Sequence, residues 1–165
     1  IGCDSQHGRG SLFWFEIPVE LQDIEELPSP RLISSTPPVP AGRPRVLCVD
    51  DNHVNRRVIE TLLTPLCEKL VLVDSGAAAL EAAQRQQFDV VLLDIHMPDM
   101  DGIETHHRLR RLANGGPNRI VALTADVVPE ALARYEVAGF DDILAKPIEM
   151  EKLLLAIGLP AIRLV

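Results

Sequence analysis

The sequence predicts an α/β fold, in which a doubly wound, five-stranded parallel sheet is covered by five helices over residues 45–158. The clearest element is residues 90–93, an unbroken run of valine and leucine that is too short for a helix and leads into Asp94. Such a run is typical of a strand buried on both faces of a parallel sheet. Four further apolar runs alternate with helical patterns, as in sheets built with right-handed crossovers.

The predicted strands are rich in β-branched residues and leucine, and they cover residues 46–49, 70–73, 89–94, 120–123 and 143–145. The predicted helices repeat apolar residues at spacings of three and four, and they cover residues 54–66, 75–87, 102–112, 129–138 and 148–157. Asp51 or Asn52 can cap the first helix, and Ser75 caps the second. Pro129 suits the first turn of the fourth helix, which Gly139 stops.

The first 44 residues have a different character. A glycine turn at residues 8–11 precedes the aromatic run 12–19, which predicts a strand that ends near Pro18. A single strand is not stable alone, so its partners lie elsewhere in the chain or outside it. Residues 21–44 are acidic and then rich in proline and serine, which predicts a linker. A short tail, 159–165, follows the α/β region, and the first residue, Ile1, indicates a fragment of a longer protein.

Composition excludes several classes of function. The formal net charge is −8, so there is no basic surplus for non-specific binding to nucleic acid. Cys3, Cys48 and Cys67 are scattered without C-x-x-C spacing, which argues against a disulfide framework or a zinc site. No apolar run approaches the roughly 18 residues of a spanning helix, and no signal peptide is present. We therefore expect a cytoplasmic fragment without direct membrane contact.

Reactive side chains end four of the five predicted strands. Asp50 and Asp51 follow the first strand, Asp94 ends the third, Thr124 ends the fourth and Lys146 follows the fifth. The carboxyl ends of parallel strands meet at one edge of the sheet, so these groups should converge there. One such residue could simply cap a turn, but carboxylates, a hydroxyl and an amine at four strand ends predict a functional site.

Three converging carboxylates predict a cation site. At a separation of about 5 Å, each pair repels by roughly 3 kcal/mol at an effective dielectric constant near 20. Hard oxygen ligands with open positions suit Mg²⁺. We assign Asp51, Asp94 and the main-chain carbonyl of His96 as direct ligands, and Asp50 as a ligand through water. The imidazole of His96 is expected to face solvent, because Mg²⁺ prefers oxygen.

With Mg²⁺ bound, Asp94 could attack a phosphorus atom and form an acyl phosphate. The Lys146 ammonium group and the Thr124 hydroxyl would then stabilise the charge on the transferring oxygens. Ala125 is small enough to leave room for the phosphoryl group.

The motifs at these strand ends resemble the receiver domain of two-component response regulators. The matching segments are Asp50-Asp51-Asn52, Leu93-Asp94-Ile95-His96-Met97-Pro98-Asp99-Met100-Asp101-Gly102, Leu123-Thr124-Ala125 and Lys146-Pro147. The resemblance implies a flavodoxin-like receiver fold over residues 45–158, with strand order 2-1-3-4-5. It also implies Mg²⁺-dependent phosphorylation of Asp94 by a phosphohistidine, with Thr124 and Lys146 as the sensing pair.

Two segments resemble hybrid sensor histidine kinases in particular. Asp51-Asn52-His53-Val54-Asn55-Arg56 is similar to the receivers attached to such kinases, and residues 1–20 look like the end of the kinase ATP-binding domain. The parent chain is then a hybrid kinase, which can be membrane-anchored. The implied partners are the kinase phosphoacceptor helix and a His-containing phosphotransfer protein. This fragment lacks the acceptor-His helix and the ATP-binding boxes of that family, so it should not autophosphorylate from ATP. As a receiver it should catalyse only its own phosphorylation.

One position departs from the family pattern. Receivers of this family usually carry Tyr or Phe three residues before the lysine, and its rotation reports phosphorylation. This sequence has Ile143 there, which argues against that switch. His96 and Asp126 lie where side chains tune hydrolysis of the acyl phosphate in the family.

Two alternatives to a relay receiver stay open. Ile143 and the long linker also fit a receiver that acts mainly as a docking or inhibitory module on its own kinase core. A Mg²⁺-dependent aspartyl-phosphate phosphatase is less well supported, because those enzymes carry an Asp two residues after the nucleophile and this chain has His96.

Overall fold

The computed structural model describes residues 2–6, 10–14, 42–113 and 116–160. The predicted linker therefore lies outside the described residues except for residues 42–44, and so does most of the predicted tail. The chain forms two compact units, Ile1–Leu32 and Ile33–Val165. Within the described part of the chain, no helix is long and apolar enough to cross a membrane.

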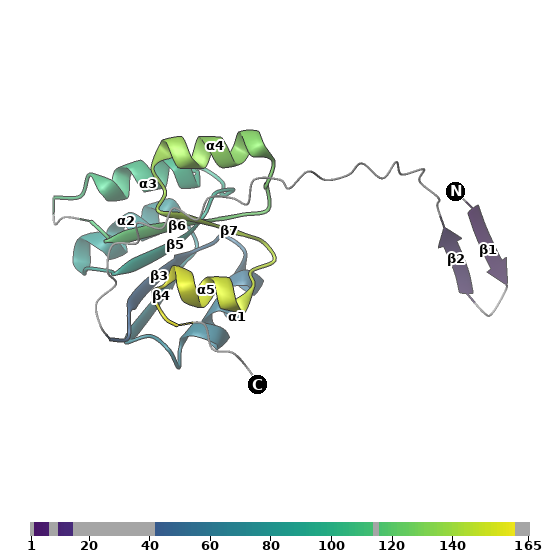
Figure 1. Ribbon diagram of the computed structural model, residues 1–165, viewed down its shortest axis with the longest axis horizontal. Coiled ribbons are helices and arrows are strands. Elements are labelled where there is room, and N and C mark those ends of the chain that lie inside the picture. The colour runs from purple at the N-terminus through teal and green to yellow at the C-terminus, as the bar shows by residue number, and fades with distance from the viewer. Residues whose placement is uncertain (1, 7–9, 15–41, 114–115, 161–165) are drawn as a thin grey trace. The chain divides into compact units, whose positions relative to one another are not determined.

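The second unit contains the predicted α/β architecture (Figure 1). Its strands are β3 (Arg45–Val49), β4 (Lys69–Val73), β5 (Val90–Asp94), β6 (Arg119–Thr124) and β7 (Asp142–Ala145). Its helices are α1 (His53–Leu63), α2 (Gly76–Arg85), α3 (Gly102–Arg110), α4 (Pro129–Ala138) and α5 (Met150–Ala156). All four strand pairings are parallel, in the order β4-β3-β5-β6-β7. Counted within this unit, that order is 2-1-3-4-5, so the predicted fold class and strand order are confirmed.

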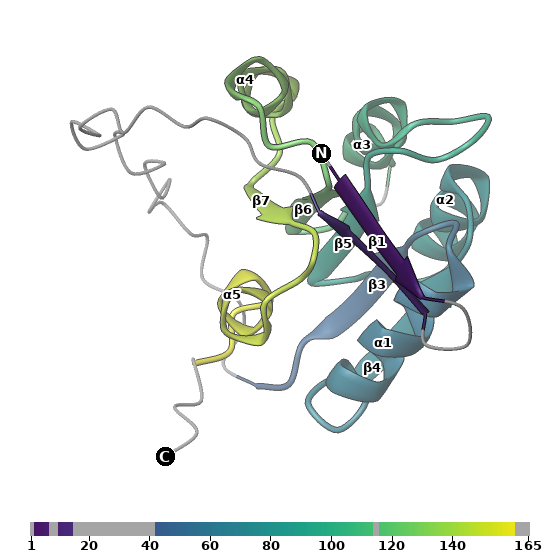
Figure 2. The ribbon, with the colours of Figure 1, turned by 90° about the vertical axis from the view of Figure 1, so that its right-hand side faces the viewer.

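The helices cover both faces of the sheet, as in a doubly wound fold (Figure 2). Helices α2, α3 and α4 pack on one face, where Leu47, Leu93 and Tyr135 belong to a single apolar cluster. Helices α1 and α5 pack on the other face, where Ile59 and Leu153 belong to a second cluster. All five residues of the central strand β5 are buried, which explains why it reads as a continuous apolar run rather than an alternating one.

The local signals at the helix ends act largely as predicted. The Asn52 side chain caps α1 by accepting a hydrogen bond from the Val54 main-chain nitrogen, and Ser75 caps α2. Gly139 ends α4 with a φ of 89°, a left-handed conformation that favours glycine. Helix α1 is shorter than predicted and ends at Leu63, because Pro65 has no main-chain N–H to continue the helix.

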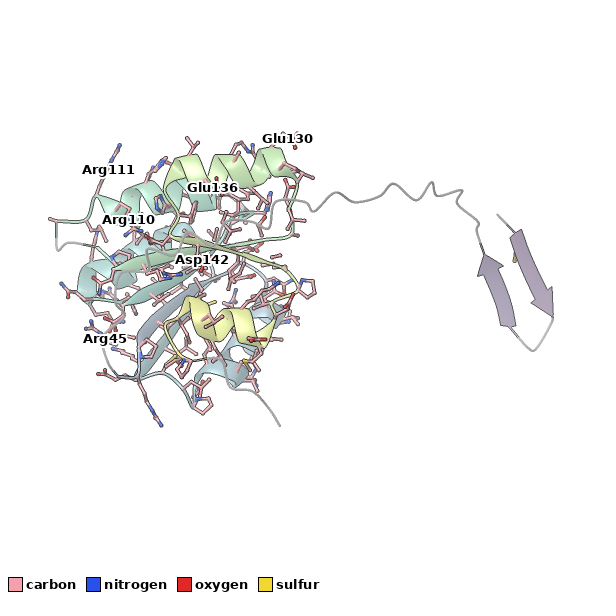
Figure 3. All side chains as sticks on the ribbon, in the orientation of Figure 1. Arg45, Arg110, Arg111, Glu130, Glu136 and Asp142 are labelled. Atoms are coloured by element: carbon pink, nitrogen blue, oxygen red, sulfur yellow. The ribbon has the colours of Figure 1, made fainter. Side chains whose placement is uncertain are left out.

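The amino ends of the strands are held by ion pairs. Arg45 begins β3, and its guanidinium nitrogens donate to the Asp89 carboxylate at 3.0 and 2.8 Å. Two further pairs, Arg110–Asp141 and Arg119–Asp142, lie along the same edge. Figure 3 shows Arg45 and Arg110 at the end of the unit opposite Glu130 in the first turn of α4. The carboxyl ends of the strands are therefore left for the candidate site.

The first unit contains a hairpin, which supplies the predicted strand with a partner inside the chain, the first of the two alternatives. Strands β1 (Gly2–Gln6) and β2 (Gly10–Trp14) pair antiparallel, with Gly2 opposite Trp14. The predicted strand is confirmed as far as Trp14, and residues 15–20 lie outside the described residues. Its partner within the chain was missed because residues 4–6 are polar and show no apolar alternation.

Candidate active site

Three carboxylates converge at the carboxyl edge of the sheet. Asp50 and Asp51 directly follow β3, and Asp94 ends the adjacent strand β5. One oxygen from each of the three lies within 4.8 Å of the others. Asp50 and Asp94 are buried, whereas Asp51 is exposed. The parallel register of β3 and β5 thus produces the convergence that the sequence predicts.

Lys146 links two of these carboxylates. Its Nζ atom lies 2.8 Å from Asp50 Oδ2 and 2.8 Å from Asp94 Oδ2. The lysine reaches the cluster from the end of β7, which is two strands away from β5. Its side chain is 20% exposed, so one ammonium group partly neutralises two nearly buried acids while staying open to the pocket.

The environment shifts the pKa values of this pair. Burial raises the pKa of Asp94, although the hydrogen bond and charge of Lys146 oppose the shift. Burial alone would lower the pKa of Lys146, but its hydrogen bonds to Asp50 and Asp94 outweigh burial and raise that pKa. This direction keeps Lys146 protonated at neutral pH.

Asp50 is held by a set of donors. Its carboxylate accepts hydrogen bonds from the Asn52 main-chain nitrogen at 2.9 Å and from Asn55 Nδ2 at 3.1 and 3.0 Å, besides the bond from Lys146. A buried carboxylate with this many donors has a fixed orientation. Asp50 therefore anchors Lys146, in addition to its predicted role at the cation site.

Asn55 and Arg56 of α1 donate hydrogen bonds to Asp50 and Asp51, and the sequence alone assigned these two residues no role at the site. Arg56 donates to the main-chain oxygens of Asp50 and Asp51 at 2.5 and 2.9 Å, and so fixes the turn after β3. Asn55 binds the Asp50 carboxylate directly. Both lie on the first turns of α1, in the segment that resembles hybrid-kinase receivers, so the motif signalled their importance without revealing their contacts.

The loop after Asp94 closes tightly over the end of β5. The His96 main-chain nitrogen donates to Asp94 Oδ1 at 3.2 Å, and the His96 side chain is exposed, as predicted. At Gly102, a Cβ atom would lie 2.5 Å from the Asp94 main-chain oxygen and 2.7 Å from Ile95 Cα. Only glycine allows this close approach, which keeps the loop against the strand.

Thr124 lies at the expected edge, but its hydroxyl is engaged elsewhere. The main-chain nitrogen of Asp126 donates to Thr124 Oγ1 at 3.0 Å, and the Tyr135 hydroxyl lies 3.3 Å away. The Lys146 main-chain nitrogen donates to the Thr124 main-chain oxygen at 2.7 Å, but within the described residues no hydrogen bond joins the Thr124 hydroxyl to Asp94 or Lys146. The structure thus brings the three acids and the lysine together, and it directs the threonine hydroxyl toward α4.

Three further positions singled out in the sequence lie close in the chain to Thr124 or Lys146. Ala125 is exposed and Asp126 is half-buried beside Thr124. Ile143 is half-buried and packs against the apolar cluster under α2, α3 and α4. It has no polar atom in its side chain to report on the pocket.

The residues fit a hard divalent cation. The three acids supply oxygen atoms, the ligand type that Mg²⁺ prefers. Among the hydrogen bonds of the described residues, none engages the exposed Asp51 carboxylate. An exposed carboxylate that accepts no hydrogen bond from the described residues, beside two buried acids, is suited to bind a cation from solvent.

Comparison with known proteins agrees with this geometry. The family model of the response regulator receiver domain matches residues 46–158. Sensor histidine kinase AruS of Pseudomonas aeruginosa is 37% identical over an alignment of 162 residues, which covers 96% of this chain and 15% of that protein. Sensor histidine kinase GacS of Pseudomonas protegens is 40% identical over an alignment of 135 residues, which covers 79% of this chain and 15% of that protein. The chain thus spans about a seventh of the length of these relatives.

Solved structures show the same fold. The Vibrio cholerae chemotaxis protein CheY4 superposes with a TM-score of 0.64 and 30% identity, over 69% of this chain and 95% of that one. A sensor histidine kinase receiver domain from Pseudomonas aeruginosa, with a magnesium ion coordinated in its active site cleft, superposes with a TM-score of 0.62 and 36% identity, over 72% of this chain and 99% of that one. The model match, the parallel sheet and these similarities lead to one conclusion: this chain belongs to the response regulator receiver domain family.

Proposed function

We propose that the second unit is the phosphoacceptor of a two-component phosphorelay and that Asp94 receives the phosphoryl group. The observation that carries the proposal is the Asp94 carboxylate, 5% exposed, hydrogen-bonded to Lys146 and clustered with Asp50 and Asp51. An Asp94 oxygen attacks the phosphorus of a phosphohistidine, the P–N bond breaks, and the imidazole leaves. The product is an acyl phosphate on Asp94.

The residues around Asp94 have separate proposed roles in this transfer. Lys146 is poised to donate to a phosphoryl oxygen, and Asp50 holds the lysine in place. Asp51, Asp94 and the His96 main-chain carbonyl would hold Mg²⁺, with Asp50 acting through water. When bound, the ion would offset charge on the phosphoryl oxygens. His96, two residues after Asp94, and Asp126, two residues after Thr124, are proposed to tune hydrolysis of the product.

The donor and the acceptor of the phosphoryl group are proposed from the relatives. Because these are sensor histidine kinases, we infer a hybrid kinase as the parent chain, with its phosphoacceptor helix as donor and a His-containing phosphotransfer protein as acceptor. The proposed organisation is a kinase remnant at 1–20, a linker at 21–44, the receiver at 45–158 and a tail at 159–165. The fragment would act in the cytoplasm, and the parent chain could be anchored in a membrane.

A second function is favoured by a separate observation. The Thr124 hydroxyl is hydrogen-bonded to Tyr135, and Ile143 occupies the position of the usual aromatic switch. A receiver with this arrangement could keep its pocket and act mainly as a docking or inhibitory module on its kinase core.

Labelling by acetyl phosphate, with and without Mg²⁺, separates these functions. Intact mass should show one phosphoryl adduct on the native chain with Mg²⁺ and none on Asp94→Asn. The matched control is Asp99→Asn, in the same loop, which should label like the native chain. Asp99 has a φ of 66°, a conformation that asparagine also tolerates. No adduct on the native chain, with altered kinase-core activity on adding the receiver, would favour the docking function.

A further inference from the structure

The Thr124 hydroxyl has competing partners. It lies 3.3 Å from the Tyr135 hydroxyl and 3.3 Å from the main-chain oxygen of Asp126, and it accepts from the Asp126 nitrogen at 3.0 Å. A hydroxyl has a single proton to donate. A Thr124 hydroxyl that turns to a phosphoryl oxygen on Asp94 moves away from Tyr135 and from Asp126, whichever of the two hydroxyls donates in the Thr124–Tyr135 hydrogen bond.

The Tyr135 hydroxyl relies on Thr124 for its hydrogen bond. Tyr135 lies on α4, is fully buried, and its ring stands edge-on to Phe140 with 6.4 Å between the ring centroids. Within the described residues, Thr124 is the hydrogen-bond partner of the Tyr135 hydroxyl. A buried phenol that loses its partner is unfavourable, so either its ring moves or the helix that carries it moves.

We propose that Tyr135 is the positioning residue that couples the state of Asp94 to helix α4. The inference rests on the proposed phosphorylation of Asp94. In the free receiver, the Thr124–Tyr135 hydrogen bond holds Thr124 toward α4. When the Thr124 side chain turns to the phosphoryl group, Tyr135 loses that bond, and α4 shifts until the phenol meets water or another acceptor.

Ile143, the other side chain expected to respond to Thr124, cannot couple Thr124 to α4 in place of Tyr135. Ile143 has no hydroxyl to exchange with Thr124, and it is wedged against the same apolar cluster as Tyr135. Among the described residues, the Thr124–Tyr135 contact is the side-chain hydrogen bond that joins the carboxyl edge of the sheet to α4. Helix α4 also carries Val137, which is 89% exposed, so its displacement would alter an apolar surface.

The chain offers a direct probe, because Tyr135 is its single tyrosine. Incorporation of 3-fluorotyrosine into the full chain gives one ¹⁹F resonance. After addition of acetyl phosphate and Mg²⁺, a second resonance should grow in proportion to the adduct that intact mass measures in the same sample. At equal adduct fraction, Thr124→Val should show no second resonance, and Thr124→Ser, which restores the hydroxyl, should show it again.

The outcomes are distinct. An adduct on the native chain without a second resonance, or an equal response in Thr124→Val, would overturn the coupling and leave the phosphoacceptor function standing. No adduct on the native chain would overturn the phosphoacceptor function and this inference with it.

Amide hydrogen exchange gives a second test that does not alter Thr124. On adduct formation, the α4 amides of the native chain should exchange at least about fivefold faster, the factor expected for loss of one hydrogen bond. Tyr135→Phe has no hydroxyl to orphan, so its α4 amides should change by less than about twofold at the same adduct fraction. The amides of α1, on the other face of the sheet, serve as the internal control. Equal acceleration of α4 in both proteins would contradict the coupling.

Discussion

At the scale of single residues, the pocket depends on one cation shared by two buried acids. Lys146 bridges Asp50 and Asp94, and each of these carboxylates is less than a tenth exposed. Breaking a buried ion pair leaves uncompensated charge, which is far more costly than losing an exposed pair.

Lys146→Met should therefore lower the free energy of unfolding by about 3 kcal/mol in the absence of Mg²⁺. Added Mg²⁺ should recover part of that loss, because it would neutralise the same acids. Urea unfolding with and without Mg²⁺ measures both effects. The control is Lys152→Met, which removes the exposed pair with Glu149 and should cost less than about 1 kcal/mol. Equal losses in the two variants would mean that the bridge has no special role.

A second residue of interest is His106, a buried residue of α3 whose ring faces Gly139 at the end of α4. Its Nε2 atom lies 3.1 Å from the Gly139 main-chain oxygen, and its ring lies 4.5 Å from the ring of Phe140. Its Nδ1 atom is buried without a partner, which fits a neutral ring protonated on Nε2. Burial, with help from the charge of Arg110, lowers the pKa of His106 to about 4.

This lowered pKa predicts a pH-dependent stability. Because the unfolded chain binds a proton near pH 6.5 and the folded chain only near pH 4, stability is fully present above pH 6.5 and is lost as pH falls through that window. The loss should be about 3 kcal/mol. His106→Gln, which keeps a donor for Gly139, should remove this part of the slope in unfolding curves taken from pH 7 to pH 4. An unchanged slope would show that His106 titrates normally.

At the scale of elements, the junction of β5 and α3 shapes the pocket. Gly102 begins α3 and brings the helix start against the Asp94 main chain, and the Gly102 nitrogen donates to the Ile95 oxygen at 3.0 Å. The Asp101 side chain caps the helix by accepting from the Glu104 nitrogen at 2.8 Å. The position of Asp94 is thus set by a strand end and a helix start together.

Gly102→Ala should destabilise the chain by at least about 2 kcal/mol, because its Cβ would collide with main-chain atoms that cannot move aside. It should also slow labelling of Asp94 by acetyl phosphate. Denaturant unfolding and intact mass measure the two effects. Gly42→Ala is the matched control, since a Cβ there meets nothing within 4 Å. A Gly102→Ala chain as stable as Gly42→Ala would contradict this account of the junction.

At the scale of the whole receiver unit, charge is arranged by sheet edge. The amino edge pairs arginines with aspartates, so its charges are matched. The carboxyl edge gathers three acids around one lysine, so a net negative charge remains there to attract a cation. The hydrogen bonds of Arg45 lower the pKa of Asp89, as expected for an acid whose charge stabilises the fold.

This arrangement predicts that stability and labelling can be altered separately. Asp89→Asn should lower the free energy of unfolding by about 1–3 kcal/mol, because it weakens buried hydrogen bonds to a charged group. Labelling of Asp94 should stay unchanged, since Asp89 lies at the other end of β5, roughly 16 Å along the strand. Glu81→Gln, which removes an exposed pair with Arg85, should change neither quantity measurably. Loss of labelling in folded Asp89→Asn would show that the two edges are coupled.

Much of the fold follows from the sequence because its signals are local. Apolar runs and helical spacings define the strands and helices of the receiver unit, and parallel order then gathers the residues after each strand at one edge. These two rules were sufficient to predict that Asp50, Asp51, Asp94 and Lys146 lie close together. It was insufficient for the partner of β2, because a polar strand has no apolar alternation to reveal it.

The tertiary structure alone decided the contacts that depend on side-chain direction. Asn55 and Arg56 stand in a motif that the sequence displays, but their hydrogen bonds to Asp50 and Asp51 follow from how α1 packs beside β3. The Thr124 hydroxyl lies at the predicted edge, yet its side-chain hydrogen-bond partner is Tyr135 of α4. Periodicity determines which residues share an element or an edge, whereas the direction of a hydroxyl depends on neighbours that only the folded chain supplies.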